Sequence, residues 1–100
     1  MAAGFRLTRD AQKDLTAIRR YTVNTWGLEQ SKRYLQGLRE TIELLVEFPG
    51  QGTTRLDVGA GVSSFPYGSH MLYYRLEKGQ LVVFAVLHQR MVPAEHLQER

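Results

Sequence analysis

The chain has 100 residues, of which 43% are hydrophobic and 23% are charged, and it contains no cysteine. This length allows one domain with one core, and the composition excludes extensive disorder, a disulfide framework and a thiolate metal site. The net charge of +3 is mildly basic and does not by itself favour an acidic or nucleic-acid partner over none. No stretch has the form of a secretory signal or approaches about 20 apolar residues, so we expect a cytoplasmic protein that does not enter the membrane.

The first residues predict a short strand that leads into a helix. Residues 4–7 alternate between apolar and polar side chains, which is typical of a strand, and Thr8 stands where a helix N-cap is expected. From residue 11 one apolar stripe runs at helical spacing as far as Trp26, whose indole ring we therefore expect in the core. Gly27 ends this helix, because glycine readily takes the left-handed conformation found after a helix C-terminus.

A second helix is predicted to follow at once. Its apolar stripe runs from Tyr34 to Phe48, and Pro49 and Gly50 end it. Because only one or two residues join the two helices, they must fold back on each other. Gly37 lies inside the second helix, where glycine costs about 1 kcal/mol relative to alanine, and a close approach to the first helix would explain its presence.

The second half of the chain predicts a sheet. Residues 50–61 hold four glycines and are typical of a loop, and three strand-like runs follow at residues 62–65, 70–76 and 81–88. The turns between these runs are short enough for antiparallel hairpins. The order β-α-α-β-β-β predicts an α+β fold, in which an N-terminal helical hairpin packs on one face of a small antiparallel sheet. We expect one domain over residues 1–100, with a short flexible C-terminal tail at about 92–100.

The last strand-like run is apolar on both of its faces. Side chains alternate between faces along a strand, so Val82, Phe84 and Val86 share one face and the residues between them share the other. Two helices cover only one face of a small sheet, which leaves the Val82 face, or the opposite one, to be covered. A docked partner, a sheet that coils around a central strand, and partial cover by residues 91–100 are all compatible with this pattern.

The stretch GSHMLYYRL contains side chains that a metal-free ribonuclease would use as base, acid and cation. The candidates, with one from the next strand, are His70, Tyr73, Tyr74, Arg75 and His88. Parity places Tyr73 and Arg75 on one face of the strand and His70 and Tyr74 on the other, among apolar neighbours. The histidines also lack metal-ligand spacing, and no phosphate-binding loop is present. We therefore expect no catalytic residues, no metal and no cofactor.

Five stretches follow one another along the chain: FRLTRDAQKDLTAIRRYT, TWGLEQSKRYLQGL, FPGQG, SFPYGSHMLYYRL and VVFAVLHQRM with a proline-led tail. As an ordered set they resemble the ParE branch of the RelE/ParE toxin superfamily, over nearly the whole chain. The most distinctive piece is LHQRM at residues 87–91.

This resemblance implies the toxin of a type II toxin–antitoxin pair. ParE-like toxins inhibit DNA gyrase by stabilising its cleaved complex with DNA, they are not enzymes, and a ParD-like antitoxin wraps them and holds them inactive. DNA would then be contacted only indirectly, through gyrase or the antitoxin complex. Two alternatives stay open on the same fold: a RelE-like ribosome-dependent mRNA endoribonuclease, and a non-toxic module that keeps only the antitoxin interface.

The resemblance and the strand pattern together suggest two sets of contact residues. A polar cluster ends the apolar last strand abruptly, and we expect it to contact gyrase through His88, Gln89, Arg90 and Met91. For the antitoxin we expect buried aromatic and arginine anchors with a basic rim that attracts an acidic segment. These antitoxin-binding candidates are Arg19, Arg20, Met71, Tyr73, Arg75, Val82, Phe84 and Val86.

Overall fold

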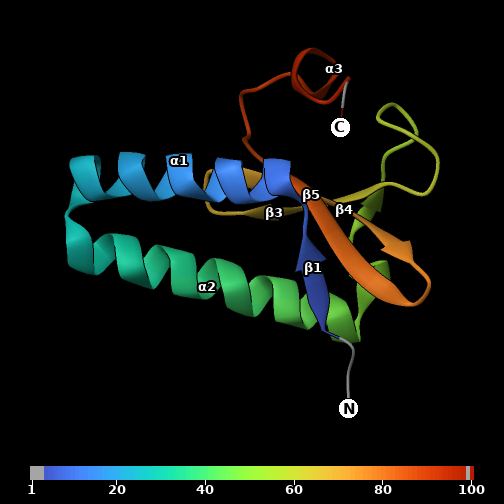
Figure 1. The fold of residues 1–100 in the computed structure, drawn as a ribbon, viewed down its shortest axis with the longest axis horizontal. Helices are drawn as coiled ribbons and strands as arrows, with labels where there is room; N and C mark the ends of the chain where they lie inside the picture. Colours follow the sequence, from blue (N-terminus) through green and yellow to red (C-terminus); the bar gives the residue numbers. More distant parts are fainter. Residues whose placement is uncertain (1–3, 99) are drawn as a thin grey trace.

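The computed structural model describes residues 4–98 and 100. Its elements, in chain order, are β1 (Phe5–Leu7), α1 (Arg9–Trp26), α2 (Leu28–Glu47), the short 3-10 helix η1 (Pro49–Gln51), β2 (Thr53–Thr54), β3 (Ser63–Tyr67), β4 (His70–Glu77), β5 (Gln80–His88) and α3 (Pro93–His96). The helices α1 and α2 form an antiparallel hairpin beside the sheet, and α3 stands apart from them above α1 in Figure 1. The predicted α+β class is confirmed.

The helix boundaries follow from local capping, as the sequence predicts. The Thr8 hydroxyl accepts a hydrogen bond from the Ala11 N–H at 3.1 Å, which satisfies one of the free donors at the start of α1. Gly27 has φ +92°, and its N–H donates to the Val23 carbonyl at 2.9 Å, so the chain turns sharply into α2. A buried hydrogen bond of 2.7 Å between the hydroxyls of Thr22 and Ser31 then joins the two helices.

The sheet has five strands in the order β1-β5-β4-β3-β2. The strands β2 to β5 are antiparallel to their neighbours, but β1 pairs with β5 in parallel, with Phe5 opposite Leu81. The prediction of a purely antiparallel sheet is wrong at this edge, because β1 and β5 are joined through the rest of the chain and not through a hairpin. The predicted loop at residues 50–61 also contains the short strand β2, and Pro66 lies in β3 and not in a turn.

Gly37 is explained by the sheet and not by α1. A methyl group added at this position would lie 2.2 Å from the Tyr67 hydroxyl oxygen, which is far inside van der Waals contact. The same hydroxyl donates a hydrogen bond to the Tyr34 carbonyl at 2.7 Å. The expected close approach is therefore present, but β3 makes it.

A β-bulge changes which side chains of β5 share a face. Tyr73 is opposite Ala85 and Tyr74 is opposite Val83, so Phe84 has no partner on β4. Consequently Phe84 and Ala85 both join the cluster on the face away from the helices, whereas the next residue, Val86, packs with the helices. The prediction that Val86 shares a face with Val82 and Phe84 is wrong, because strict alternation does not survive a bulge.

The face away from the helices is already covered by this chain. Leu97, just after α3, is buried there with Phe84 and Leu87, and Val58 from the long loop packs against the same cluster. Partial cover by the C-terminal segment is confirmed, whereas an open apolar face is not found in the described residues. Among residues 4–98 and 100, no helix is both long and apolar enough to cross a membrane.

Candidate partner-binding surfaces

The four residues predicted to contact gyrase form a turn at the end of β5. Gln89 fixes this turn to the β3–β4 connection, because its N–H donates to the Ser69 carbonyl at 2.8 Å and its side-chain amide donates to the Gly68 carbonyl at 2.8 Å. The Arg90 N–H donates to Nδ1 of His88 at 3.1 Å, which makes that ring nitrogen the acceptor. The side chains of Arg90 and Met91 are exposed on this fixed backbone. The set is therefore contiguous, and hydrogen bonds of Gln89 and His88 anchor its backbone.

Behind this turn lies a chain of aromatic rings that the sequence did not indicate. The Tyr34 hydroxyl lies 2.7 Å from Nδ1 of His70, and the His70 and His88 rings are 5.6 Å apart between centroids. Trp26 meets the edge of Tyr34 with 5.3 Å between ring centroids, and 37% of Trp26 is exposed, so its expected place in the core is wrong. The sequence places Tyr34 in the apolar stripe of α2, but such a stripe does not predict that the Tyr34 hydroxyl forms a hydrogen bond with His70.

Burial shifts the proton affinities in this aromatic chain. Desolvation lowers the pKa of His70 below its ordinary value of 6.5, and the nearby His88 lowers it further. Burial raises the pKa of the Tyr34 hydroxyl. Both side chains are therefore held in their neutral forms, which suits the direct hydrogen bond between them.

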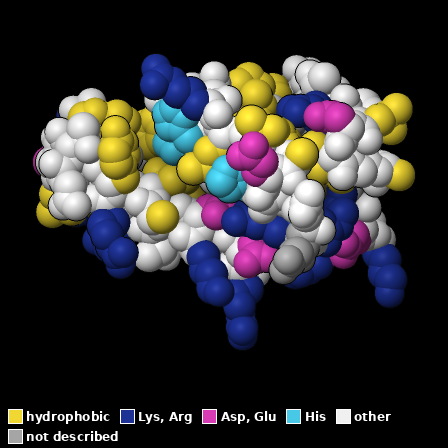
Figure 2. Space-filling model, turned by 90° about the horizontal axis from the view of Figure 1, so that it is seen from above, with side chains coloured by type: hydrophobic (Ala, Val, Ile, Leu, Met, Phe, Trp, Pro, Cys, Tyr) yellow, Lys and Arg dark blue, Asp and Glu magenta, His cyan; other side chains and the backbone are white. Residues whose placement is uncertain are grey.

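A groove of about 450 Å³ runs from the His70–His88 pair along α1. Its walls come from α1, from the end of β5 and from the C-terminal segment, and it is lined among others by Ala17, Tyr21, Val86, Met91 and His96. In Figure 2 histidine, basic and apolar side chains lie together on this side of the molecule. The predicted residues His88 and Met91 thus border a larger concave surface. Residues of α1 also line this surface, which the helical periodicity of the sequence did not indicate.

The sheet residues predicted for the antitoxin largely come together on the face away from the helices. Tyr73 and Phe84 pack with 6.5 Å between ring centroids, and the Arg75 guanidinium lies 5.0 Å from the Phe84 ring centre. Met71 joins the same cluster, and Tyr73, Val82, Phe84 and Val86 are each less than 5% exposed. These side chains are core residues of the free chain, and Arg75 and Met71 are the partly exposed members of the set.

The other two antitoxin candidates lie elsewhere. Arg19 and Arg20 are exposed on α1 and border a separate shallow groove of about 250 Å³ that is formed by the helical hairpin. The structure therefore divides the predicted set into a helix part and a sheet part.

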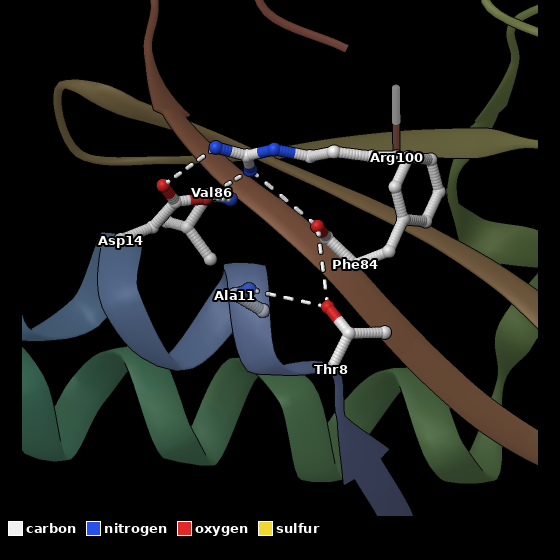
Figure 3. A network of polar contacts seen from close by, with 6 residues as sticks. All are labelled: Thr8, Ala11, Asp14, Phe84, Val86 and Arg100. Carbon is white, nitrogen blue, oxygen red and sulfur yellow. Dashed lines mark hydrogen bonds and ion pairs between the residues drawn. The ribbon is translucent and has the colours of Figure 1, made fainter. Parts of the chain in front are cut away.

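A polar network closes the C-terminal segment onto α1. The Arg100 guanidinium makes a two-pronged ion pair with the Asp14 carboxylate, with 3.0 Å between Nη2 and Oδ1. Asp14 also accepts a hydrogen bond from the Val86 N–H at 2.9 Å, and Arg100 lies 3.5 Å from the Phe84 carbonyl (Figure 3). The Asp14 carboxylate raises the pKa of Arg100. The pairing of β1 with β5 ends at Val83. Beyond that point, the side chains of Asp14 and Arg100 take up hydrogen-bonding groups of the β5 backbone.

Residues 5–93 match the model of a protein family described as ParE toxin of the type II toxin–antitoxin system parDE. This chain belongs to the ParE toxin family. It is 38% identical to Toxin ParE1 of Caulobacter vibrioides over 93 residues, which is 93% of this chain and 96% of that protein. It is 30% identical to Toxin ParE of Escherichia coli over 95 residues, 94% of this chain and 92% of that protein.

A solved structure shares the fold of this ParE-family toxin. A chain of the chromosomal ParDE toxin–antitoxin system from P. aeruginosa superposes with a TM-score of 0.74 at 21% sequence identity. The superposition covers 87% of this chain and 96% of that chain. The helical hairpin and the sheet are therefore the arrangement found in that system.

The ribonuclease candidates of this ParE-family toxin are divided by the sheet. Tyr73 packs on one face, whereas Tyr74 packs with the helices and uses its hydroxyl to bond the Pro49 carbonyl at 2.6 Å. His70 bonds Tyr34, and Arg75 pairs with Glu77 and lies over Phe84. Within residues 4–98 and 100, no group of three histidine or acidic side chains is placed to bind a metal ion.

Proposed function

We propose that this ParE-family toxin inhibits DNA gyrase by stabilising the cleaved gyrase–DNA complex, and that a ParD-like antitoxin holds it inactive. The observation that carries the proposal is the family match over residues 5–93, together with two ParE toxins among its relatives. Inhibition of this kind requires a binding surface and no chemistry by the toxin itself, so the protein is not an enzyme. It acts in the cytoplasm, where its target lies.

We assign the gyrase contact to His88, Gln89, Arg90 and Met91. In support, two Gln89 hydrogen bonds fix this turn to its surroundings, so the backbone that carries the exposed side chains needs little further ordering on binding. Arg90 supplies an exposed cation. Met91, which lines the groove, supplies an adaptable apolar side chain. An arginine beside an apolar contact is a common form of binding hot spot.

We assign the antitoxin contact to both parts of the predicted set. Arg19 and Arg20 form the basic rim on α1, and Met71 and Arg75 are the accessible residues of the sheet part. Tyr73, Val82 and Phe84 are buried in the free chain, so they contact an antitoxin only where a covering segment moves away. Val86 is buried on the other face, against the helices.

The test of the gyrase proposal is a cleavage assay. Purified toxin is added to gyrase, supercoiled plasmid and ATP, and linear DNA is scored after denaturation of the protein. We expect linear plasmid to accumulate, and to disappear when a ParD-like antitoxin is added first. If folded toxin leaves the plasmid uncut, gyrase is not the target, and mRNA cleavage on translating ribosomes becomes the next assay.

A further inference from the structure

The C-terminal segment has two anchors on the body of the protein. Leu97 is buried in the cluster that contains Phe84 and Leu87, and the Arg100 side chain pairs with Asp14. Between and around these anchors the segment touches little, since Ala94, Glu95, His96 and Gln98 are exposed. A segment with so few buried contacts opens locally at a much smaller free-energy cost than global unfolding.

The Asp14–Arg100 ion pair is more enclosed than a surface pair. Only 19% of the Arg100 side chain and 14% of the Asp14 side chain is exposed, and the pairing is two-pronged. By comparison, the Arg39–Glu43 pair on α2 exposes 64% and 53% of its side chains. Two-pronged arginine–carboxylate pairs that are shielded from water contribute more than exposed single contacts. The Asp14–Arg100 pair is thus the stronger of the two, and it holds the end of the C-terminal segment on α1.

We propose that residues 93–98 together with Arg100 form a latch, held by the Asp14–Arg100 ion pair, that covers the sheet face at Phe84 and Leu87 (the docking face) in the free toxin and opens to admit a partner there. The partner's identity, a ParD-like antitoxin, rests on the function proposed above. The closed latch does not rest on that function, because it is argued from the contacts of Leu97 and Arg100, which lie beyond the family match at residues 5–93.

The two anchors also define the chemistry of the segment that replaces the latch. Opening uncovers an apolar site where Leu97 was, and it removes the cation from Asp14, which stays tied to the Val86 N–H. A partly buried carboxylate without a cation is unfavourable. We therefore expect the displacing antitoxin segment to present an apolar side chain to the Leu97 site and a lysine or arginine to Asp14.

The latch is tested first on the isolated toxin by amide hydrogen exchange. Arg100→Gln removes the Asp14–Arg100 ion pair, and Arg39→Gln removes an arginine from the exposed pair on α2 as the matched control. We expect the Leu97 amide to exchange about three- to tenfold faster in Arg100→Gln, with Leu72 in the interior of β4 unchanged, and no effect in the control. Leu97→Ala, which weakens the other anchor, should act in the same direction.

Equal exchange of the residue 97 amide in wild type, Arg100→Gln and Leu97→Ala would overturn the latch. The second measurement is the association rate with purified ParD-like antitoxin, which should rise in Arg100→Gln by a similar factor; an unchanged rate would show that the segment does not gate the docking face. Because exchange is measured without gyrase or antitoxin, failure of the cleavage assay leaves the latch result standing. Faster exchange at Leu97 would support the latch without testing the gyrase proposal, which is tested separately by the cleavage assay.

Discussion

His70 is a buried histidine whose pKa is lowered by the fold. Its folded-state pKa lies below 6.5, so as the pH falls below about 6.5 the unfolded chain binds a proton before the folded chain does. The contribution of neutral His70 to the free energy of unfolding is therefore fully present above that pH, and it is lost as the pH falls toward the folded-state pKa. We expect the thermal midpoint of the wild type to drop between pH about 7.5 and 5, and His70→Asn to drop less.

The matched control for His70 is His96→Asn, which removes an exposed histidine at the C-terminal segment. It should follow the wild-type pH dependence. If His70→Asn has the same pH dependence as the wild type, the burial of His70 near His88 does not govern acid sensitivity.

Arg90 is the residue at which the gyrase proposal is most sharply tested. Its side chain is exposed on a backbone that His88 fixes, so Arg90→Ala removes a contact without disturbing the core. We expect plasmid cleavage by gyrase to fall about tenfold or more while antitoxin affinity is kept. Arg33→Ala, an exposed arginine of α2, is the control and should leave cleavage unchanged. Full cleavage with Arg90→Ala would remove this residue from the gyrase contact.

At the scale of elements, Gly37 connects α2 with β3. Alanine favours a helix by about 1 kcal/mol over glycine, but the added methyl group would overlap the Tyr67 hydroxyl, and overpacking costs about 1–3 kcal/mol. We expect Gly37→Ala to lower the free energy of unfolding in urea by about 1 kcal/mol. In a Tyr67→Phe background the nearest atom left is the ring carbon Cζ at 3.2 Å, so most of the overlap is removed and the same change should cost less than in the wild type. An equal loss in both backgrounds would show that Tyr67 is not the obstacle.

The elements themselves were largely predictable, because capping and periodicity are local signals. Thr8, Gly27 and Pro49 mark helix ends with their own backbone chemistry, and each acts where the sequence places it. The bulge at Phe84 was not predictable, since an unpaired residue depends on the register between two strands. For that reason the parity argument holds for Tyr73 and Arg75 but fails for Val86.

Contacts between distant parts of the chain were also beyond the sequence pattern. Nothing in a helical stripe shows that Asp14 meets Arg100, or that Tyr34 meets His70, because each pair depends on the complete fold. The resemblance to ParE toxins and the strand pattern together supplied the gyrase and antitoxin sets, and these sets stay predictions.

At the scale of the whole molecule, the mildly basic charge affects how fast partners associate. Arg19 and Arg20 are exposed on α1, and the net charge of the chain is +3. If the antitoxin segment is acidic, its association rate should fall about tenfold between roughly 0.05 and 0.5 M salt, because long-range attraction is screened. Stopped-flow mixing measures this dependence.

The salt dependence can be assigned to one face by paired substitutions. Arg19→Gln with Arg20→Gln should flatten it, whereas Lys32→Gln with Arg33→Gln on α2 makes the same change in charge and should flatten it less. Equal flattening by both pairs would mean that net charge, and not the α1 rim, attracts the antitoxin.

Because β1 pairs in parallel with β5, the sheet cannot be completed until the ribosome has synthesised β5. The ribosome makes β1 first, but its partner residues Leu81–Val83 come only after every other strand of the sheet. Until β5 emerges, the nascent chain carries a helical hairpin whose apolar side has no complete sheet to pack against. The surfaces by which this protein would harm the cell therefore come into existence only after the synthesis of β5.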